Sequence, residues 1–228
     1  MIEIPLIPDP IIHCDFDHVY SPSEDSFLIL DYLKQKINYS YFDDILITKI
    51  GKILDLGTGT GIIAILLQKI KSYNPNFNPK IYASDISEEA IKCAKLNEKA
   101  NNFNDEIVFL CSNLFESFPD NLKNTFNIII FNPPYLPSSK LIKNKTMIDL
   151  SWNGGNKGYN LIIRFLKNAL SYLNLKKEHY IYCVTSSKTN LKEFNKVIKN
   201  LGYKNEIVKN QHIFFEDIFL NRLKYVLD

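Results

Sequence analysis

The chain has 228 residues, 46% of them hydrophobic and 23% charged, and carries a net charge of +2 at neutral pH. This length suits one globular domain that buries roughly 70% of its unfolded surface. The many Ile, Leu, Phe and Tyr residues exclude disorder, and no apolar run reaches the ~18 residues of a membrane span. Only Arg164 and Arg222 among the 27 basic residues are arginine, and acids and bases are mixed along the chain, which argues against a duplex-binding protein.

The cysteines and the N-terminus give no sign of secretion. Cys14, Cys93, Cys111 and Cys183 are far apart and form no C-x-x-C pair, so neither a disulfide framework nor a zinc cluster is expected. The first ten residues lack a basic segment followed by an apolar stretch. We therefore expect a cytoplasmic protein, with the nucleus as an alternative, and no metal site.

A helix is expected to follow the irregular, proline-rich first 20 residues. Ser21 is the predicted N-cap, Pro22 the first helical residue, and Glu24 completes a capping box. The expected apolar face of this helix consists of Phe27, Leu30, Leu33 and Ile37.

From residue 52 onward, short apolar runs alternate with amphipathic segments. This alternation predicts right-handed βαβ units and a doubly wound, mostly parallel sheet. Two strand-like runs without an intervening helix, at about 205–227, predict an antiparallel C-terminal hairpin. We expect an N-terminal segment with its helix (1–50) and a domain (51–228) that form one structural unit. The expected strands lie near 52–56, 80–84, 106–111, 126–131 and 179–185, and the expected helices near 61–71, 87–101, 158–174 and 188–201.

Two stretches look like insertions in loops. Residues 39–49 precede the first strand of the domain, and residues 72–79 separate its first helix from its second strand. The second stretch is rich in Asn and Pro, so we expect an exposed, mobile loop that takes no part in a site.

The segment 52–70 is typical of a buried strand, a glycine turn and a helix. Gly57, Gly59 and Gly61 let the backbone turn sharply and approach a ligand. Their G-x-G-x-G spacing is tighter than that of dinucleotide binders. Asp55, just before the turn, would repel a pyrophosphate but suit an ammonium group. The pattern favours a cofactor with a positively charged amino-acid end and no phosphates.

Polar residues also end the next two strands. An acid in the position of Asp85 can accept both hydroxyls of a ribose, and Ser87 is expected to cap the following helix. The alternative for Asp85 is a plain loop acid. Together with the glycine turn, it resembles the S-adenosylmethionine (SAM) site of class I methyltransferases. Asn113 follows the third strand, where these enzymes often place an Asp on the adenine amino group, and its amide oxygen could accept the same bond.

Asn132-Pro133-Pro134-Tyr135 follows an apolar run, at the sheet edge where open α/β folds bind ligands. The two prolines rigidify the backbone and remove two donors. The Asn132 side-chain oxygen and the Pro133 carbonyl would accept both hydrogens of a planar nitrogen, while Tyr135 stacks on its plane. Holding both hydrogens directs the nitrogen's electron density toward a methyl donor. The alternative is a rigid turn without a function.

These motifs, with VYSPSEDSFLILDYL (19–33), SWNGGNKGYNLIIRF (151–165) and YCVTSS (182–187), resemble the HemK family of protein glutamine methyltransferases. That family modifies the GGQ loop of translation release factors, and the similarity is strongest to its short eukaryotic/archaeal branch. The resemblance implies a class I SAM-dependent methyltransferase fold, Rossmann-like, with a mostly parallel seven-stranded sheet and an antiparallel C-terminal strand. It also implies N5-methylation of the GGQ glutamine in a eukaryotic-type release factor.

The resemblance further implies roles for individual residues. Asn132, Pro133 and Tyr135 would be catalytic, and Asn132 would touch both SAM and the substrate amide. The loop 136–158, with Trp152 and Gly154-Gly155, would form a lid around the glutamine, although Trp152 could equally serve packing alone. The implied SAM contacts are Tyr20 and Ser26 over the cofactor, Asp55, Gly57 and Gly59 at its methionine part, Asp85 and Ile86 at the ribose, and Asn113 and Leu114 at the adenine.

A small zinc-binding activator protein is the partner that the resemblance implies. The strand at 106–111 is expected at a sheet edge with four apolar residues in a row, and such an edge invites pairing. Strand addition by the activator would cover it. The alternative is that a helix of the same chain does so.

Three other functions stay open at this point. Adenine-N6 methyltransferases of DNA or RNA share the NPPY tetrapeptide, but arginine is scarce and a separate target-recognition domain is lacking. A protein lysine methyltransferase using the same pocket would need a base to deprotonate the ammonium group, and none is assigned. A non-catalytic binding module is disfavoured by the intact Asn132 and glycine turn.

Overall fold

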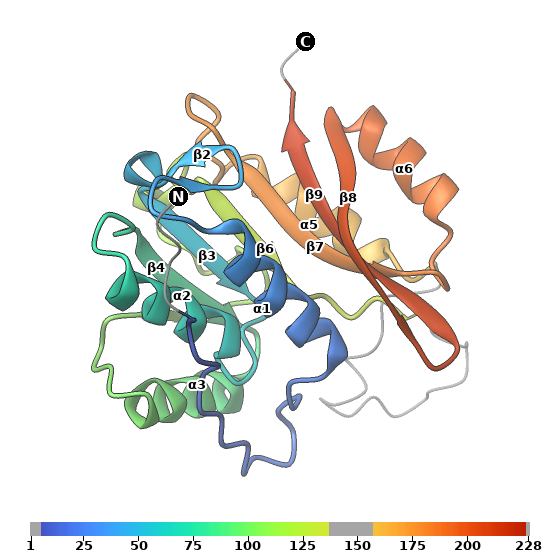
Figure 1. Cartoon of the computed structure of the whole chain (residues 1–228). Coiled ribbons are helices and arrows are strands. Elements are labelled where there is room, and N and C mark those ends of the chain that lie inside the picture. The colour runs from blue at the N-terminus through green and yellow to red at the C-terminus, as the bar shows by residue number, and fades with distance from the viewer. Residues whose placement is uncertain (1–5, 137–156, 227–228) are drawn as a thin grey trace.

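The computed structural model describes residues 6–136 and 157–226, and its centre is a seven-stranded sheet in the order β5-β4-β3-β6-β7-β9-β8 (Figure 1). The first five strands in this order are parallel, whereas β9 runs antiparallel to β7 and to β8. This is the doubly wound sheet with an antiparallel C-terminal hairpin that the sequence predicts. The strands are β3 (Lys52–Leu56), β4 (Lys80–Asp85), β5 (Val108–Cys111), β6 (Ile128–Phe131), β7 (Tyr180–Ser186), β8 (Tyr203–Ile213) and β9 (Glu216–Tyr225).

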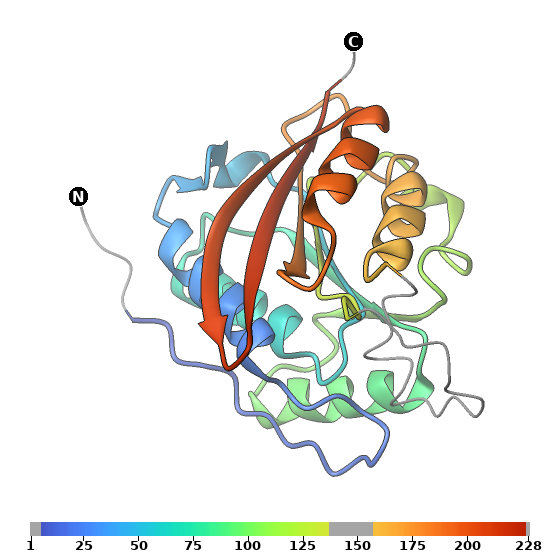
Figure 2. The same cartoon turned by 90° about the vertical axis from the view of Figure 1, so that its right-hand side faces the viewer.

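Helices cover both faces of the sheet. α1 and α2 lie on one face, whereas α5 and α6 lie on the other (Figures 1 and 2). The central strand β6 shows why both faces are apolar. Ile128 and Ile130 pack in the core under α1 and α2, and Ile129 and Phe131 pack in the core under α5 and α6, as the period-2 alternation of a strand requires. The helices are α1 (Glu24–Lys36), α2 (Ile62–Tyr73), α3 (Glu88–Ala100), α5 (Asn160–Ala169) and α6 (Leu191–Asn200). None of those described is long and apolar enough to cross a membrane.

The start of α1 differs from the prediction. Its N-cap is Ser23, with an extended backbone, so Pro22 lies outside the helix and Ser21 is not the cap. The Ser23 carbonyl accepts the Phe27 N–H at 3.0 Å, which closes the first turn two residues later than expected. Phe27 itself is 44% exposed, whereas Leu28 and Ile29 are buried. Leu30, Leu33 and Ile37 of the predicted apolar face are buried as expected, so the prediction fails only at Phe27.

The prediction of an exposed loop at 72–79 is wrong in part. α2 continues to Tyr73, and Phe77 is buried in the core beneath the turn that follows. Asn74 is also buried, and its amide donates a hydrogen bond to the Asn38 carbonyl at 3.0 Å. The Asn- and Pro-rich composition thus forms a packed turn, in which Asn74, Phe77 and Pro79 are buried.

The segment 39–49 forms a short hairpin, β1 (Tyr41–Phe42) and β2 (Ile45–Leu46), followed by a 3-10 turn η1 (Ile47–Lys49). A second 3-10 turn, η2 (Asp120–Leu122), precedes β6. Phe42, Ile45 and Ile47 are buried. The insertion is therefore part of the core that lies under α1.

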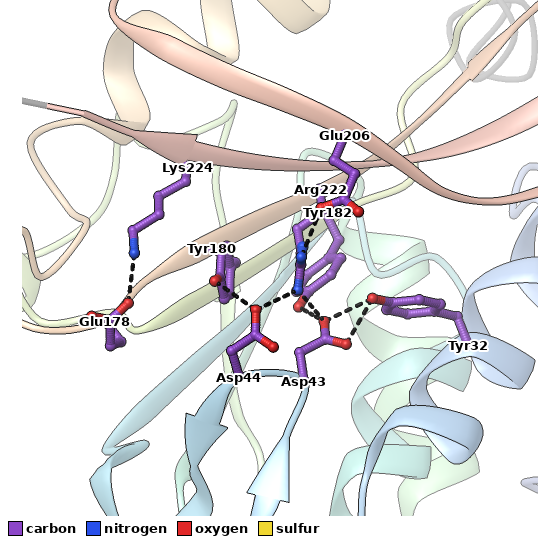
Figure 3. A network of polar contacts seen from close by, with 9 residues as sticks. All are labelled: Tyr32, Asp43, Asp44, Glu178, Tyr180, Tyr182, Glu206, Arg222 and Lys224. Atoms are coloured by element: carbon purple, nitrogen blue, oxygen red, sulfur yellow. Dashed lines mark hydrogen bonds and ion pairs between the residues drawn. The ribbon is translucent and has the colours of Figure 1, made fainter.

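A polar network joins the β1–β2 turn to the C-terminal strands (Figure 3). Its centre is Arg222 of β9, whose guanidinium lies 3.5 Å from Asp43 and 3.1 Å from Asp44. Asp43 is almost fully buried and accepts the phenol hydrogen of Tyr32, on α1, at 2.7 Å. The network thus holds α1, the β1–β2 turn and β9 together. Its other members are Glu178, Tyr180, Tyr182, Glu206 and Lys224.

Candidate active site

A cavity of about 770 Å³ lies at the carboxyl ends of the parallel strands. The size is typical of pockets that hold a small molecule or cofactor. Its walls come from segments far apart in the sequence: the start of α1, the loops after β3, β4, β5 and β6, the start of α5 and the β8–β9 turn. Eleven of the twelve predicted site residues line it: Tyr20, Ser26, Gly57, Gly59, Asp85, Ile86, Asn113, Leu114, Asn132, Pro133 and Tyr135.

The three glycines of the turn have two different functions. Gly57 and Gly59 line the cavity with φ of +68° and +54°, and a Cβ on Gly57 would lie 3.2 Å from the Phe131 ring. Gly61, with φ +85°, is not a lining residue. A Cβ there would lie 2.9 Å from the Cβ of Ala94, so Gly61 permits the close approach of α2 and α3. The expectation that all three approach a ligand therefore fails at Gly61.

Asp55 is the predicted site residue that does not line the cavity. It is buried, and its Oδ2 accepts hydrogen bonds from the Thr58 hydroxyl at 2.6 Å and the Ala64 N–H at 3.2 Å. These bonds fix the glycine turn to the first residues of α2. The Oδ1 atom is buried with no partner among the described residues. Burial raises the pKa of this carboxyl to about 7.

Asp85 orients the turn from the neighbouring strand. Its carboxylate accepts the Gly59 N–H at 3.0 Å and the Ser87 N–H at 2.9 Å, and burial raises its pKa. The Ser87 hydroxyl caps α3 by accepting the Ala90 N–H, which confirms the predicted cap. Ile86, 53% exposed, adds an apolar surface beside the carboxylate. An acid next to an apolar surface suits a ribose that carries a planar base.

The Asn113 amide is more engaged than the sequence suggests. Its Oδ1 accepts a hydrogen bond from Arg164 Nη2 at 2.6 Å, and its Nδ2 donates to Glu116 at 3.0 Å. The Asn113 oxygen that was expected to bind adenine therefore already accepts a hydrogen bond from Arg164. Arg164 lies on α5 and also lines the cavity. The sequence gives no signal for this contact, since 51 residues separate the two positions.

The NPPY tetrapeptide lies next to the glycine turn, because Phe131 and Leu56 are paired at the ends of β6 and β3. The Asn132 Oδ1 atom is buried without a hydrogen-bond partner among the described residues, although it belongs to a residue of the cavity wall. A buried carbonyl oxygen without a donor is costly, so this atom is expected to receive one from a ligand.

Asp25 is a site residue that the sequence analysis missed. This buried carboxylate, in the first turn of α1, accepts the phenol hydrogens of Tyr135 at 3.2 Å and Tyr20 at 3.4 Å. It thereby joins the NPPY turn to the N-terminal segment over the cavity. Burial, and next the negative charge of Asp25, raises the pKa of Tyr135. Asp25 lies in the SPSEDSF motif, but the predicted capping box in this motif uses Glu24, so no sequence pattern assigns Asp25 to the site.

Part of the expected lid lies outside the described residues. Trp152, Gly154 and Gly155 belong to it, as does most of the loop 136–158. Among residues 6–136 and 157–226, no group of three His, Cys, Asp or Glu side chains could hold a metal ion.

Comparisons with known proteins place this site in a family. The Methyltransferase small domain family matches residues 39–150. A Methanocaldococcus jannaschii protein that carries the name of a protein N5-glutamine methyltransferase is 35% identical over 202 residues, 89% of either chain. Methyltransferase HEMK2 of Mus musculus is 26% identical over 204 residues, 87% of either chain. A chain of the E. cuniculi Mtq2-Trm112 complex has a TM-score of 0.63 at 20% identity, with 92% of this chain and 99% of that chain covered.

The sheet order and the site at its carboxyl edge are those of the class I methyltransferase fold, and the similarity to the Methanocaldococcus jannaschii protein shows that this protein is a methyltransferase. Within the class, the chain belongs to the HemK family of protein glutamine methyltransferases. The predicted fold class and family are thereby confirmed, whereas the roles of the individual site residues stay predictions.

Proposed function

We propose that the enzyme methylates N5 of the glutamine in the GGQ motif of a eukaryotic-type release factor, with SAM as the methyl donor. The single observation that carries this proposal is the buried, unpartnered Oδ1 of Asn132 beside the glycine turn. It provides the acceptor that a planar amide nitrogen requires, at the place where a methyl donor would be held.

The size of the cavity and the chemistry of its lining support SAM as the methyl donor. Gly57 and Gly59 leave room for close approach of the methionine part, and Asp85 and Ile86 offer an acceptor and an apolar surface for the ribose and adenine. When bound, SAM supplies an electrophilic methyl group on a sulfonium centre. Asp55 contributes indirectly, because its hydrogen bonds to Thr58 and Ala64 hold the glycine turn in the conformation that faces the cavity.

The protein's own contribution is to orient the amide. The Asn132 Oδ1 atom and the Pro133 carbonyl would each accept one hydrogen of the substrate's NH₂ group. An amide nitrogen is a poor nucleophile because its lone pair is delocalised, and fixing both hydrogens turns its electron density toward the methyl donor. Such positioning can lower a barrier by ~7–11 kcal/mol in well-oriented reactions. Methylation gives a cationic nitrogen, which loses a proton to solvent without a dedicated base.

Similar proteins support this choice of substrate. The archaeal relative is named for protein N5-glutamine methylation, and the E. cuniculi complex is described as responsible for the methylation of the termination factor eRF1. Translation termination takes place in the cytoplasm, which is the location we propose. We also propose that residues 1–50 and 51–228 act as one unit, because Asp25 of α1 contacts the NPPY turn.

We further propose that a small zinc-binding activator pairs with β5. This strand is at the edge of the sheet, and no described strand covers its outer side. α3 packs against β5, but Val108, Phe109 and Leu110 stay partly exposed. An edge strand of this kind is a template for strand addition.

The test is to incubate the protein, purified with its activator, with SAM and a GGQ-bearing release factor, and to map the methyl group by tandem mass spectrometry. A release factor with the glutamine replaced by alanine is the matched control. Methyl on the glutamine, absent from the control, supports the proposal. Transfer only to adenine in DNA or RNA, or only to lysine, would contradict it.

A further inference from the structure

The β8–β9 turn has a composition that its fold does not explain. Ile213 and Glu216 are paired at the end of the hairpin, so Phe214 and Phe215 form a two-residue turn. Such turns favour Asn and Gly because their backbone requires positive φ. Here Phe214 has φ +43°, a conformation that is unfavourable for a bulky side chain. Backbone strain of this kind is concentrated at functional sites.

Both phenylalanines of this turn project into solvent. Phe214 is 85% exposed and Phe215 is 92% exposed. Among the large apolar side chains of the described residues, only Leu6, at 93%, is more exposed than Phe215. Two adjacent exposed aromatic rings contribute nothing to the core. They are, however, the residue type that most often anchors one protein on another.

The turn is continuous with the active site. Ile213 and Glu216, which flank the two phenylalanines, both line the cavity that contains Asn132. The strand residue next to the turn is held in place by two hydrogen bonds. The Ser187 N–H donates to the Asp217 carbonyl at 2.8 Å, and the Asp217 N–H donates to the Ser187 hydroxyl at 3.0 Å. The β8–β9 turn therefore forms part of the cavity wall, where it can contact a chain whose side chain enters the cavity.

Glu216 supplies a second, independent observation. Its Oε2 atom is buried and has no hydrogen-bond partner among the described residues. A carboxylate oxygen in this state requires a donor such as a peptide N–H. The negative charge of Glu216 disfavours phosphate, and Asp217 beside it is paired with His212 at 2.8 Å, so the turn offers no free cation to a nucleic acid and suits a polypeptide better.

We propose that the turn Ile213–Glu216 is a docking element for the protein substrate, in which Phe214 and Phe215 contact an apolar patch of the release factor and Glu216 accepts a backbone N–H next to the target glutamine. The proposal rests on the function proposed above and adds the surface that recognises the folded substrate.

The first test removes the aromatic rings and keeps the turn. The double variant Phe214→Gly/Phe215→Asn places glycine at the turn position that has positive φ and a common turn residue at the other, so the hairpin should fold at least as well as in the wild type. Ile207→Thr, an exposed position on β8 away from the turn, is the matched control. The enzyme with its activator is assayed on the intact release factor and on a short GGQ peptide, and SAM affinity is measured by calorimetry.

We expect the double variant to raise the KM for the release factor at least tenfold, with kcat, the KM for the peptide and SAM affinity within twofold of the wild type. Ile207→Thr should match the wild type throughout. Glu216→Ala should raise the KM for both the peptide and the protein, because both present the backbone N–H.

The outcomes separate the two proposals. If the wild type methylates the release factor and the double variant has an unchanged KM for it, the docking proposal is wrong and the proposed function stands. If the wild type does not methylate the release factor, the proposed function is wrong and the docking proposal falls with it. A KM increase for the peptide equal to that for the protein would mean that the rings shape the cavity and do not dock the folded substrate.

Discussion

Asn132 is the residue on which the proposed chemistry depends most directly. Its Oδ1 is buried and unpartnered, and the two prolines that follow prevent the backbone from relaxing toward it. We expect Asn132→Ala to lower kcat by about 10²–10³-fold, the range for loss of one preorganised polar group, while SAM binding weakens only slightly. Activity measured by methyl transfer and SAM binding measured by calorimetry separate the two effects.

Asn113→Ala is the matched control for Asn132→Ala. It removes an amide that lines the same cavity and forms hydrogen bonds with Arg164 and Glu116. This amide has no proposed contact with the reacting nitrogen. This variant should affect SAM affinity more than kcat. An Asn132→Ala enzyme that retains more than a tenth of the wild-type kcat would refute the role given to Asn132.

Asp55 links the stability of the glycine turn to pH. Burial raises its pKa to about 7 in the folded chain, against about 3.9 in an unfolded one. Between these values the folded protein keeps a proton that the unfolded chain has lost, so the free energy of unfolding falls as pH rises from about 4 to about 7. Three pKa units correspond to at most about 4 kcal/mol. Asp55→Asn keeps the shape and cannot ionise, so it should remove this dependence.

Urea unfolding at several pH values between 4 and 8 measures the effect. We expect the stability of Asp55→Asn relative to the wild type to increase with pH across that window. Asp120→Asn, at an exposed carboxylate of η2, is the control and should show no such increase. A difference between Asp55→Asn and the wild type that is independent of pH would contradict the prediction.

At the scale of elements, Gly61 determines how closely α2 and α3 pack. A Cβ at this position would lie 2.9 Å from the Cβ of Ala94 and 3.2 Å from its Cα, on a backbone with φ +85°. Gly61→Ala should therefore destabilise the fold by about 1–3 kcal/mol, the usual cost of overpacking, with an added cost for the positive φ. The midpoint of urea unfolding measures this change.

Gly51→Ala is the matched comparison for Gly61→Ala. A Cβ on Gly51 would meet only Asn127 Oδ1 at 3.6 Å, an ordinary contact. Its effect on stability should stay within about 0.5 kcal/mol, as for most changes without a clash or a lost partner. Equal effects of the two substitutions would show that the helix approach does not explain the glycine.

At the scale of the whole molecule, the sequence predicts those features of the fold and site that repeat regularly along the chain. The run Ile128–Phe131 and the alternation of strands with helices indicate the parallel sheet, and motifs at strand ends indicate the site, because parallel strands end at one edge. Contacts between distant segments carry no such signal. The bond from Arg164 to Asn113 and the burial of Phe77 depend on how segments meet in space, and Asp25 acquires its role only when α1 lies beside the NPPY turn.

The outer edge of β5, which no described strand covers, allows a test of the proposed partner that needs no mutation. The Ser112 N–H donates to the Asp85 carbonyl at 2.8 Å, so this amide points toward β4. Because successive residues of a strand face opposite sides, the Leu110 N–H also points toward β4, while those of Phe109 and Cys111 point outward. Strand addition would pair only the outward set.

Residue-resolved hydrogen exchange should therefore give an alternating pattern. In the chain alone, the amides of Phe109 and Cys111 should exchange quickly, because no described strand pairs with them, whereas those of Leu110 and Ser112 should be protected. Adding the activator should slow exchange at Phe109 and Cys111 by at least tenfold and change Leu110 and Ser112 much less. The inward pair is thus an internal control for general stabilisation of the fold. Uniform protection along β5 would indicate that the partner binds elsewhere, and unchanged exchange in a fully active complex would exclude strand addition at this edge.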